Sequence, residues 1–335
     1  MSQTAAVHAD QILLAPADAR ALIRAQFPQF GDADVQPLIT SGTVNAIFRI
    51  GSEATARFPL RPADPVTLAH RLEQESSDMR ELAEHCPVAV PAPLGIGRPA
   101  GTFPLPWSVQ TWLDGQVATP DGLAGSTPFA ADLVALIAAL RTADLRGRRF
   151  VGTGRGGRLP DHDAWVAECL ARGAKLLDVI RLAALWARLR NMPDPSVEVM
   201  SHGDLIPANL LVRGERLVGV LDTGGFGPAD PALDLVSGWH LLDRPAREVL
   251  RRELGCSDVE WLRGAAWAFE QAMGLVWYYR ITNPGMSVLG RSTLDRLLDD
   301  PELTDLVGTP SADPGPDHPA GGTVESPGSD EATRS

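Results

Sequence analysis

The sequence has few cysteines, and their spacing does not favour cross-linking. Cys86, Cys169 and Cys256 are odd in number, lie far apart and include no CxxC pair. This spacing argues against a disulfide framework and against a zinc-binding cysteine cluster. A chain without paired cysteines is typical of a reducing compartment, so we predict a cytoplasmic location.

The sequence also lacks long apolar runs and an excess of basic charge. Residues 1–5 have neither the basic flank nor the apolar run of a secretion signal, and no later segment reaches transmembrane length. The formal net charge is −12. Phosphate backbones require a basic protein surface, so this charge argues against a nucleic-acid partner. We therefore expect neither a membrane nor a nucleic acid among the partners.

The apolar content is nevertheless sufficient for a large core. A chain of 335 residues with 44% hydrophobic residues suits one large unit of two lobes. The first part mixes the two kinds of regular structure. Helices are expected at 16–27 and 66–85, and strands at 38–40, 46–50, 54–58 and 108–113.

Beyond Pro120 the pattern becomes mainly helical. Helices are expected at 130–140, at 163–190 with a division near 179–182, and again from residue 234 onwards. Residues 309–335 are rich in Pro, Gly, Ser and acidic residues and are predicted to be a disordered tail. We therefore predict an N-terminal lobe at 1–113, a C-terminal lobe at 114–308 and the tail at 309–335.

Three polar residues follow one another in the order that a phosphoryl-transfer site requires. Asn209 comes five residues after Asp204, and Asp222 follows one hairpin later. The hairpin, at 210–221, would bring Asn209 and Asp222 to the same end. Their two oxygen donors suit Mg²⁺, which prefers oxygen ligands, while Asp204 can face a substrate hydroxyl. This order predicts a kinase-type site for a small-molecule substrate.

The residues around this set resemble a known family. His202-Gly203-Asp204, the Asn209 and Asp222 positions, and the run Gly-Pro-Ala-Asp-Pro-Ala-Leu-Asp-Leu at 227–235 are similar to the aminoglycoside phosphotransferase family. The resemblance implies an α+β, protein-kinase-like two-lobed fold, with a small β-rich N-lobe and a mainly helical C-lobe. It also implies individual roles: Asp204 would be the catalytic Asp, His202 would support its loop, Asn209 and Asp222 would bind Mg²⁺, and Asp234 would brace the loop through backbone N–H groups.

The resemblance extends to a nucleotide-binding region in the N-terminal part, with ATP or GTP as donor. Arg57 stands where many members have a phosphate-binding Lys, and Glu75, in preference to Glu73, is its expected carboxylate partner. A surface role for Arg57 and a solvated Glu75 are the simpler alternatives. The other implied nucleotide contacts are Ser41, Gly42, Thr43 and Asn45 in a nucleotide-covering hairpin, and Gln110 and Trp112 in the segment facing the adenine edge.

Two rival phosphate-handling classes lack their other residues. A metallophosphoesterase would need further His and Asn ligand clusters, and Asp222-Thr223 lacks the second Asp of a DxDxT phosphatase motif.

The sequence signals for the acceptor-binding side are less specific than those for the phosphoryl-transfer site. Most tryptophans of the chain are expected in the core. By the resemblance, four residues fall where the family builds its acceptor pocket, and three acids could meet the ammonium groups of a cationic substrate. The former are Trp239, Glu270, Trp277 and Tyr278, and the latter are Asp161, Asp163 and Asp243.

Three functions stay open at this point. The first is a kinase acting on an antibiotic such as an aminoglycoside or a related natural product. The second is a metabolic kinase with a sugar, an amino alcohol or a homoserine-like acceptor. The third is a kinase-like binding module without turnover. The expected partners are a nucleoside triphosphate and a small hydroxylated substrate, and no oligomeric state is predicted.

Overall fold

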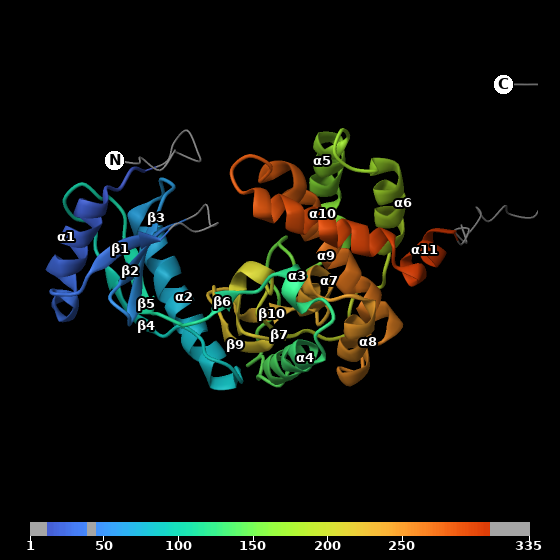
Figure 1. Ribbon diagram of the computed structural model, residues 1–335, viewed down its shortest axis with the longest axis horizontal. Helices are drawn as coiled ribbons and strands as arrows, with labels where there is room; N and C mark the ends of the chain where they lie inside the picture. Colours follow the sequence, from blue (N-terminus) through green and yellow to red (C-terminus); the bar gives the residue numbers. More distant parts are fainter. Residues whose placement is uncertain (1–11, 39–44, 309–335) are drawn as a thin grey trace, which may run out of the picture.

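The computed structural model describes residues 12–38 and 45–308. A β-sheet with two long helices forms the N-terminal part, and helices with two small sheets form the rest (Figure 1). The α+β, two-lobed fold expected from the sequence is therefore confirmed. Within the described ranges, no helix combines the length and the apolar character that a membrane crossing needs.

The N-terminal sheet is antiparallel, with the strand order β1-β2-β3-β5-β4. Its aromatic side chains build the core: the rings of Phe58 and Trp107 stack with 4.5 Å between centroids, and Phe103 meets Phe58 edge-on. Helix α1 (Pro16–Gln26) adds Leu22 and Ile23 to this cluster. The strands are β1 (Val35–Leu38), β2 (Asn45–Ile50), β3 (Ala54–Pro59), β4 (Pro93–Gly97) and β5 (Trp107–Thr111).

Helix α2 (Pro65–His85) belongs to both lobes. It begins with Pro65 and with the Asp64 side chain accepting the N–H of Thr67, which together satisfy its first turn. Leu68 and Leu72 near its start join the core of the N-terminal sheet, while Leu82 near its end joins the core of the helical lobe. The helix therefore carries its middle, where Glu75 lies, past the boundary between the lobes.

Two small antiparallel sheets support the catalytic segment in the C-terminal lobe. One consists of β6 (Gln116–Val117), β8 (Leu210–Arg213) and β9 (Arg216–Val220), and the other pairs β7 (Val199–Ser201) with β10 (Gly227–Ala229). The hairpin expected at 210–221 is present as β8 and β9. Gly214 in its turn has φ of +60°, which favours glycine.

The remaining helices surround the buried helix α9 (Asp258–Tyr278). The expected helix at 163–190 forms as α5 (Asp163–Gly173) and α6 (Val179–Leu189), so it is divided as predicted, with the break at 174–178 rather than at 179–182. The other α-helices are α3 (Pro120–Leu123), α4 (Thr127–Arg141), α7 (Val236–Leu241), α8 (Arg244–Glu253), α10 (Pro284–Leu298) and α11 (Pro301–Gly308). The single-turn helices are η1 (Pro28–Phe30), η2 (Leu159–His162), η3 (Pro207–Asn209) and η4 (Leu233–Leu235).

Candidate active site

The loop between β7 and β8 holds Asp204 at the centre of a polar cluster. Asn209 donates its Nδ2–H to the Asp204 backbone carbonyl at 2.9 Å and to Oδ2 of the side chain at 3.1 Å. The other carboxylate oxygen, Oδ1, lies 3.0 Å from Nη2 of Arg155 and 3.4 Å from Nε2 of Gln271. Asp204 is partly exposed, and Asn209, Arg155 and Gln271 contact its carboxylate from three sides.

Backbone contacts fix the start of this loop. The buried carboxylate of Asp234 accepts the N–H groups of His202 at 3.0 Å and of Gly203 at 3.2 Å. Gly203 has φ of +81°, which glycine adopts without strain. Asp234 thus makes the backbone contacts that the family resemblance implies, and they hold the loop in a turn that presents Asp204.

His202 links the catalytic loop to the end of the hairpin. Its Nδ1 lies 3.3 Å from the N–H of Asp204, and its Nε2 lies 3.0 Å from the carbonyl of Leu221. These partners assign Nδ1 as acceptor and Nε2–H as donor, which is the neutral tautomer. His202 is almost fully buried, and its ring bridges the loop that carries Asp204 and the residue before Asp222.

Asp222 stands at the end of β9 in an unusual backbone conformation. Its φ is +57°, a left-handed value that Asp tolerates better than most residues. The N–H of Leu221 donates to the carbonyl of Asn209 at 2.8 Å, so the two ends of the hairpin meet as the sequence predicted. The amide nitrogen of Asn209 is held by Asp204, so Oδ1 is the atom of this side chain that could bind a metal.

This donor set fits Mg²⁺. Asn209 and Asp222 offer oxygen atoms only, and Mg²⁺ typically takes one or two protein oxygens while the rest of its ligands are phosphates and water. Across residues 12–38 and 45–308, no group of three or more His, Cys, Asp or Glu residues could hold a metal by itself. A metal at this site would thus be held jointly by the protein and a nucleotide.

Arg57 pairs with the hairpin rather than with α2. Its Nη2 lies 3.0 Å from Oδ1 of Asp222, whereas Glu75 pairs with Arg71 of its own helix at 3.3 Å. The sequence expectation of an Arg57–Glu75 ion pair is therefore not met within the described residues. The reason is proximity: Arg71 is one helical turn from Glu75, and the half-exposed Asp222 offers Arg57 a carboxylate closer than α2 does.

Glu75 is nevertheless in the site. Burial is the largest influence on its carboxyl and raises its pKa, with the positive charges of Arg71 and Arg57 opposing that rise. It lies against the loop that follows Asp222, because a Cβ added to Gly224 would come within 2.7 Å of the Glu75 Cγ. Glu73 instead pairs with His70 at 3.6 Å on the exposed side of the helix.

The predicted nucleotide-covering residues are only partly described. Ser41, Gly42 and Thr43 lie outside the described residues, while Asn45 opens β2 opposite Pro59. Gln110 is buried within β5. The backbone N–H of Trp112 donates to the Glu53 carbonyl at 2.7 Å, so a nucleotide base would have to use other groups of this segment.

The acceptor side contains acids that are already paired. Nδ1 of His162 lies 3.0 Å from Oε1 of the buried Glu270, and hydrogen bonding to Glu270 raises the pKa of His162 against the opposing effect of burial. Asp163 accepts from Arg190 at 2.7 Å and from Trp186 at 2.9 Å. These side chains stabilise the lobe and offer little free negative charge.

Two of the residues suggested for the acceptor side have structural positions instead. Trp239 is 1% exposed and lies in the core beside Trp261, and Asp243 caps α8 by accepting the N–H of Ala246. Trp277 and Tyr278 lie at the end of α9, edge-to-face with 5.7 Å between ring centroids. Asp161 is partly exposed, with Arg158 at 4.0 Å.

Two residues beside Asp204 were not among the candidates. Gln271 lies on α9, and its Oε1 is 2.9 Å from Nε2 of His240, whose Nδ1 lies 2.8 Å from the Thr293 hydroxyl. Burial lowers the pKa of His240 to about 4, so this chain of hydrogen bonds is neutral. Arg155 could have been suspected from its glycine-rich surroundings at 152–157, but Gln271 has no signal in the sequence.

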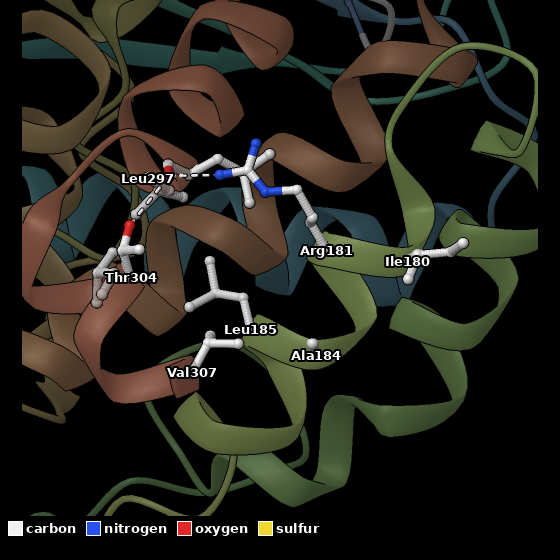
Figure 2. Close-up of a pocket in the computed structure, with 9 residues that line it drawn as sticks. Ile180, Arg181, Ala184, Leu185, Leu297, Thr304 and Val307 are labelled. Carbon is white, nitrogen blue, oxygen red and sulfur yellow. Dashed lines mark hydrogen bonds between the residues drawn. The ribbon is translucent and has the colours of Figure 1, made fainter. Parts of the chain in front are cut away.

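A separate cavity lies away from this chemistry. It has a volume of about 180 Å³ and lies between α6, α10 and α11. Figure 2 shows Arg181 at its edge, donating to the Leu298 carbonyl at 3.0 Å, with Leu185, Leu297 and Val307 beside it. Its mostly apolar lining contains no residue of the Asp204 cluster, so it plays no part in the site described above.

The fold is that of a kinase-like phosphotransferase, and Asp204, Asn209 and Asp222 lie near the end of the hairpin that faces Arg57 of the N-terminal sheet. The sequence matches the family model described as "APH: Phosphotransferase enzyme family" over residues 35–267. The chain therefore belongs to this phosphotransferase family, whose members act on hydroxyl groups. A search of curated protein sequences gave no match.

Solved structures share the fold at low sequence identity. The GDP and kanamycin complex of APH(2")-IIia is 18% identical, with a TM-score of 0.63 over 83% of this chain and 97% of that one. Macrolide 2'-phosphotransferase MphH from Brachybacterium faecium is 20% identical, with a TM-score of 0.53 over 84% and 98%. The streptomycin–ATP–APH(2")-IIa ternary complex is 14% identical, with a TM-score of 0.53 over 77% and 90%.

Proposed function

We propose that the protein transfers the γ-phosphoryl group of ATP or GTP to a hydroxyl of an antibiotic, such as an aminoglycoside or a related natural product. The observation that carries this proposal is the convergence of Asp204, Asn209 and Asp222 at one end of the β8–β9 hairpin. The similar structures of a GDP and kanamycin complex, a streptomycin and ATP complex and a macrolide 2'-phosphotransferase support the donor and the acceptor class.

In this reaction Asp204 orients the acceptor hydroxyl and takes its proton. The hydroxyl oxygen forms a bond to the γ-phosphorus as the bond to the β–γ bridging oxygen breaks, so the nucleoside diphosphate leaves. Arg57 can exchange Asp222 for the donor phosphates, which it would meet with a planar fork of N–H groups. Mg²⁺ held by Asn209 and Asp222 would neutralise phosphate charge. Most of the rate acceleration then comes from positioning and electrostatics.

The acceptor side favours a molecule with an apolar face over a polycation. Glu270 and Asp163 are neutralised by His162 and Arg190, as described above, and Glu168 pairs with Arg172 at 2.9 Å. Aromatic rings are available instead: Trp165 is 36% exposed and Tyr278 is 39% exposed. Gln271, Gly274 and Tyr278 follow one another along one face of α9, and Trp165 covers that face at Gly274. These aromatic side chains therefore line α9 for about 10 Å, over the seven residues from Gln271, which contacts Asp204, to Tyr278.

A labelled-phosphate assay tests the proposal. The purified full chain is incubated with γ-labelled ATP or GTP and with kanamycin, gentamicin, streptomycin, a macrolide, an amino alcohol and homoserine. We expect labelled antibiotic, with the macrolide preferred over the more highly charged aminoglycosides, and no product from Asp204→Asn. Labelling of only the amino alcohol or homoserine would support the metabolic kinase instead. Equal, background signals from both proteins with every acceptor would support the non-catalytic module.

A further inference from the structure

Arg155 is the second arginine of the site, and it contacts the carboxylate that the proposed reaction uses as its base. Its Nη2 is 3.0 Å from Oδ1 of Asp204, and the two side chains are 36% and 30% exposed. Gln271 shares that oxygen and Asn209 donates to the other one. An acceptor hydroxyl approaching Oδ1 therefore has to take the place of the guanidinium.

The backbone that carries Arg155 is held firmly on one side. Gly156 has φ of +97°, and a Cβ there would lie 2.8 Å from the Ala229 Cβ, so only glycine fits. Its carbonyl accepts the N–H of Asp230 at 2.9 Å. Asp230 directly follows β10, the partner of the strand that leads into the catalytic loop. The fold thus ties the base of Arg155 to the same small sheet that positions Asp204.

The other side of Arg155 is open. A Cβ added to Gly152 or Gly154 would meet no atom within 4 Å. The partly exposed side chain consequently has room to change its direction while its backbone stays in place. Arg158, three residues later, points to other carboxylates: its Nε lies 3.4 Å from Asp194, and its Nη1 lies 4.0 Å from Asp161. Only Arg155 of this loop contacts the cluster.

A phosphoryl group in transfer would come within reach of this guanidinium. A general base lies about 3 Å from the hydroxyl that it serves, and the phosphorus lies about 3–3.5 Å beyond that oxygen before reaction. If the hydroxyl takes the place of Arg155 at Oδ1, the transferring group is about 6 Å from the Asp204 carboxylate and on the same side as Arg155. Arginine presents a fork of donors that matches two phosphoryl oxygens, and a cation there offsets the charge that spreads over them.

We propose that Arg155 leaves Asp204 when donor and acceptor bind and contacts the γ-phosphoryl group during its transfer. This inference rests on the proposed kinase function. Arg155 keeps its protons throughout, the acceptor proton goes to Asp204, and the bonds made and broken are those described above. Arg57 and Arg155 then act alike: each pairs with a carboxylate of the site and moves to phosphate, Arg57 from the N-lobe and Arg155 from the C-lobe.

Three variants of the full chain test the role of Arg155. Arg155→Ala is expected to lower kcat by about a hundredfold to a thousandfold, while the Kd of ADP changes by less than about threefold. Arg155→Lys, which keeps the charge without the fork, is expected to fall between Arg155→Ala and the wild type. Arg158→Ala is the matched control from the same loop and is expected to keep kcat within about twofold, because exposed ion pairs contribute little.

A second readout does not depend on which acceptor is used. ADP with aluminium fluoride and Mg²⁺ imitates the phosphoryl group in transfer, and the wild type is expected to bind this mixture far more tightly than ADP alone. Arg155→Ala should lose most of that gain. An unchanged gain, a kcat close to that of the wild type, a raised kcat, or a change confined to the acceptor KM would overturn the proposal. If the wild type bound no nucleotide at all, the proposed function itself would fall.

Discussion

At the scale of single residues, the carboxylates of Asp234 and Asp222 differ in their burial and in the donors that they contact. Asp234 is buried and takes two backbone N–H groups, which makes it a fixed support. Asp222 is half-exposed and takes one guanidinium, which a metal and a nucleotide can replace. The use of Arg at position 57 follows the whole chain, in which Lys175 is the only lysine. Arg57 therefore keeps the positive charge in a chain that rarely uses lysine.

Asp222→Asn should remove the Mg²⁺ dependence of nucleotide binding. The amide has no negative charge to attract a divalent cation, so Mg²⁺ should tighten ATP binding in the wild type and hardly at all in the variant. We expect kcat to fall by about a hundredfold or more. Titration calorimetry with ATP, in Mg²⁺ and in EDTA, measures the difference. Asp161→Asn serves as the control, since its carboxylate has one distant partner. Equal Mg²⁺ dependence in both variants would remove Asp222 from the metal site.

At the scale of elements, the contact between α2 and the loop after β9 determines how closely the N-lobe and the hairpin approach each other at the site. Gly224 lets the backbone of that loop approach the side chain of Glu75, which is partly buried and whose pKa is raised by that burial. Any side chain at this position pushes α2 away from the hairpin. The distance between Arg57 and Asp222 should then increase, because Arg57 is on the sheet against which the first half of α2 packs.

Gly224→Ala should consequently impair both catalysis and stability. The new methyl group would lie 2.7 Å from Cγ and 2.9 Å from Cβ of Glu75. Overpacking of this kind costs about 1–3 kcal/mol in the free energy of unfolding. We expect kcat/KM for the donor to fall by about tenfold or more, measured in steady-state kinetics. Gly122→Ala is the control, because its nearest atom would be 3.9 Å away. A Gly224→Ala enzyme with unchanged kinetics would show that α2 yields without effect.

At the scale of the whole molecule, a buried ion pair makes stability depend on pH. Glu270 raises the pKa of His162 above its ordinary value of 6.5 in the folded state. A group whose folded pKa is raised contributes its full stabilisation below the unfolded value, and this contribution is lost as pH rises through the folded value. This pair should therefore stabilise the folded state fully below about pH 6.5, and the stabilisation should be lost as pH rises from there through the raised pKa of His162.

Urea unfolding of the wild type and of Glu270→Gln at about pH 6 and about pH 9 measures this linkage. The free energy of unfolding of the wild type should exceed that of the variant by more at the lower pH. Glu73→Gln provides the control, because the His70–Glu73 pair has side chains 76% and 66% exposed and is screened by solvent. Parallel profiles for wild type and Glu270→Gln would contradict a protonated His162.

Sequence patterns predict the long elements and the carboxylate order, but they predict contacts poorly. The segments at 16–27, 54–58 and 66–85 have capping residues or β-rich composition, and each forms the expected element. Strands β7 and β10 have three residues each, too few for a period to appear, and they form only because they pair with one another. Arg155, Gln271 and Asp204 meet through tertiary packing, so no local pattern links them.

The position of α2 also bears on where the chain could be divided into two halves. Leu68 and Leu72 are bound into one core and Leu82 into the other, while the backbone of Ala89 joins the helical lobe through hydrogen bonds with Val218 at 3.3 Å and Val220 at 2.9 Å. The boundary between the two hydrophobic cores therefore lies in the middle of α2. Recombination that cuts the chain between the sheet and the helices would separate Leu82 from its neighbours. A chimera with a different nucleotide-binding half should therefore keep the second half of α2 together with the helical lobe.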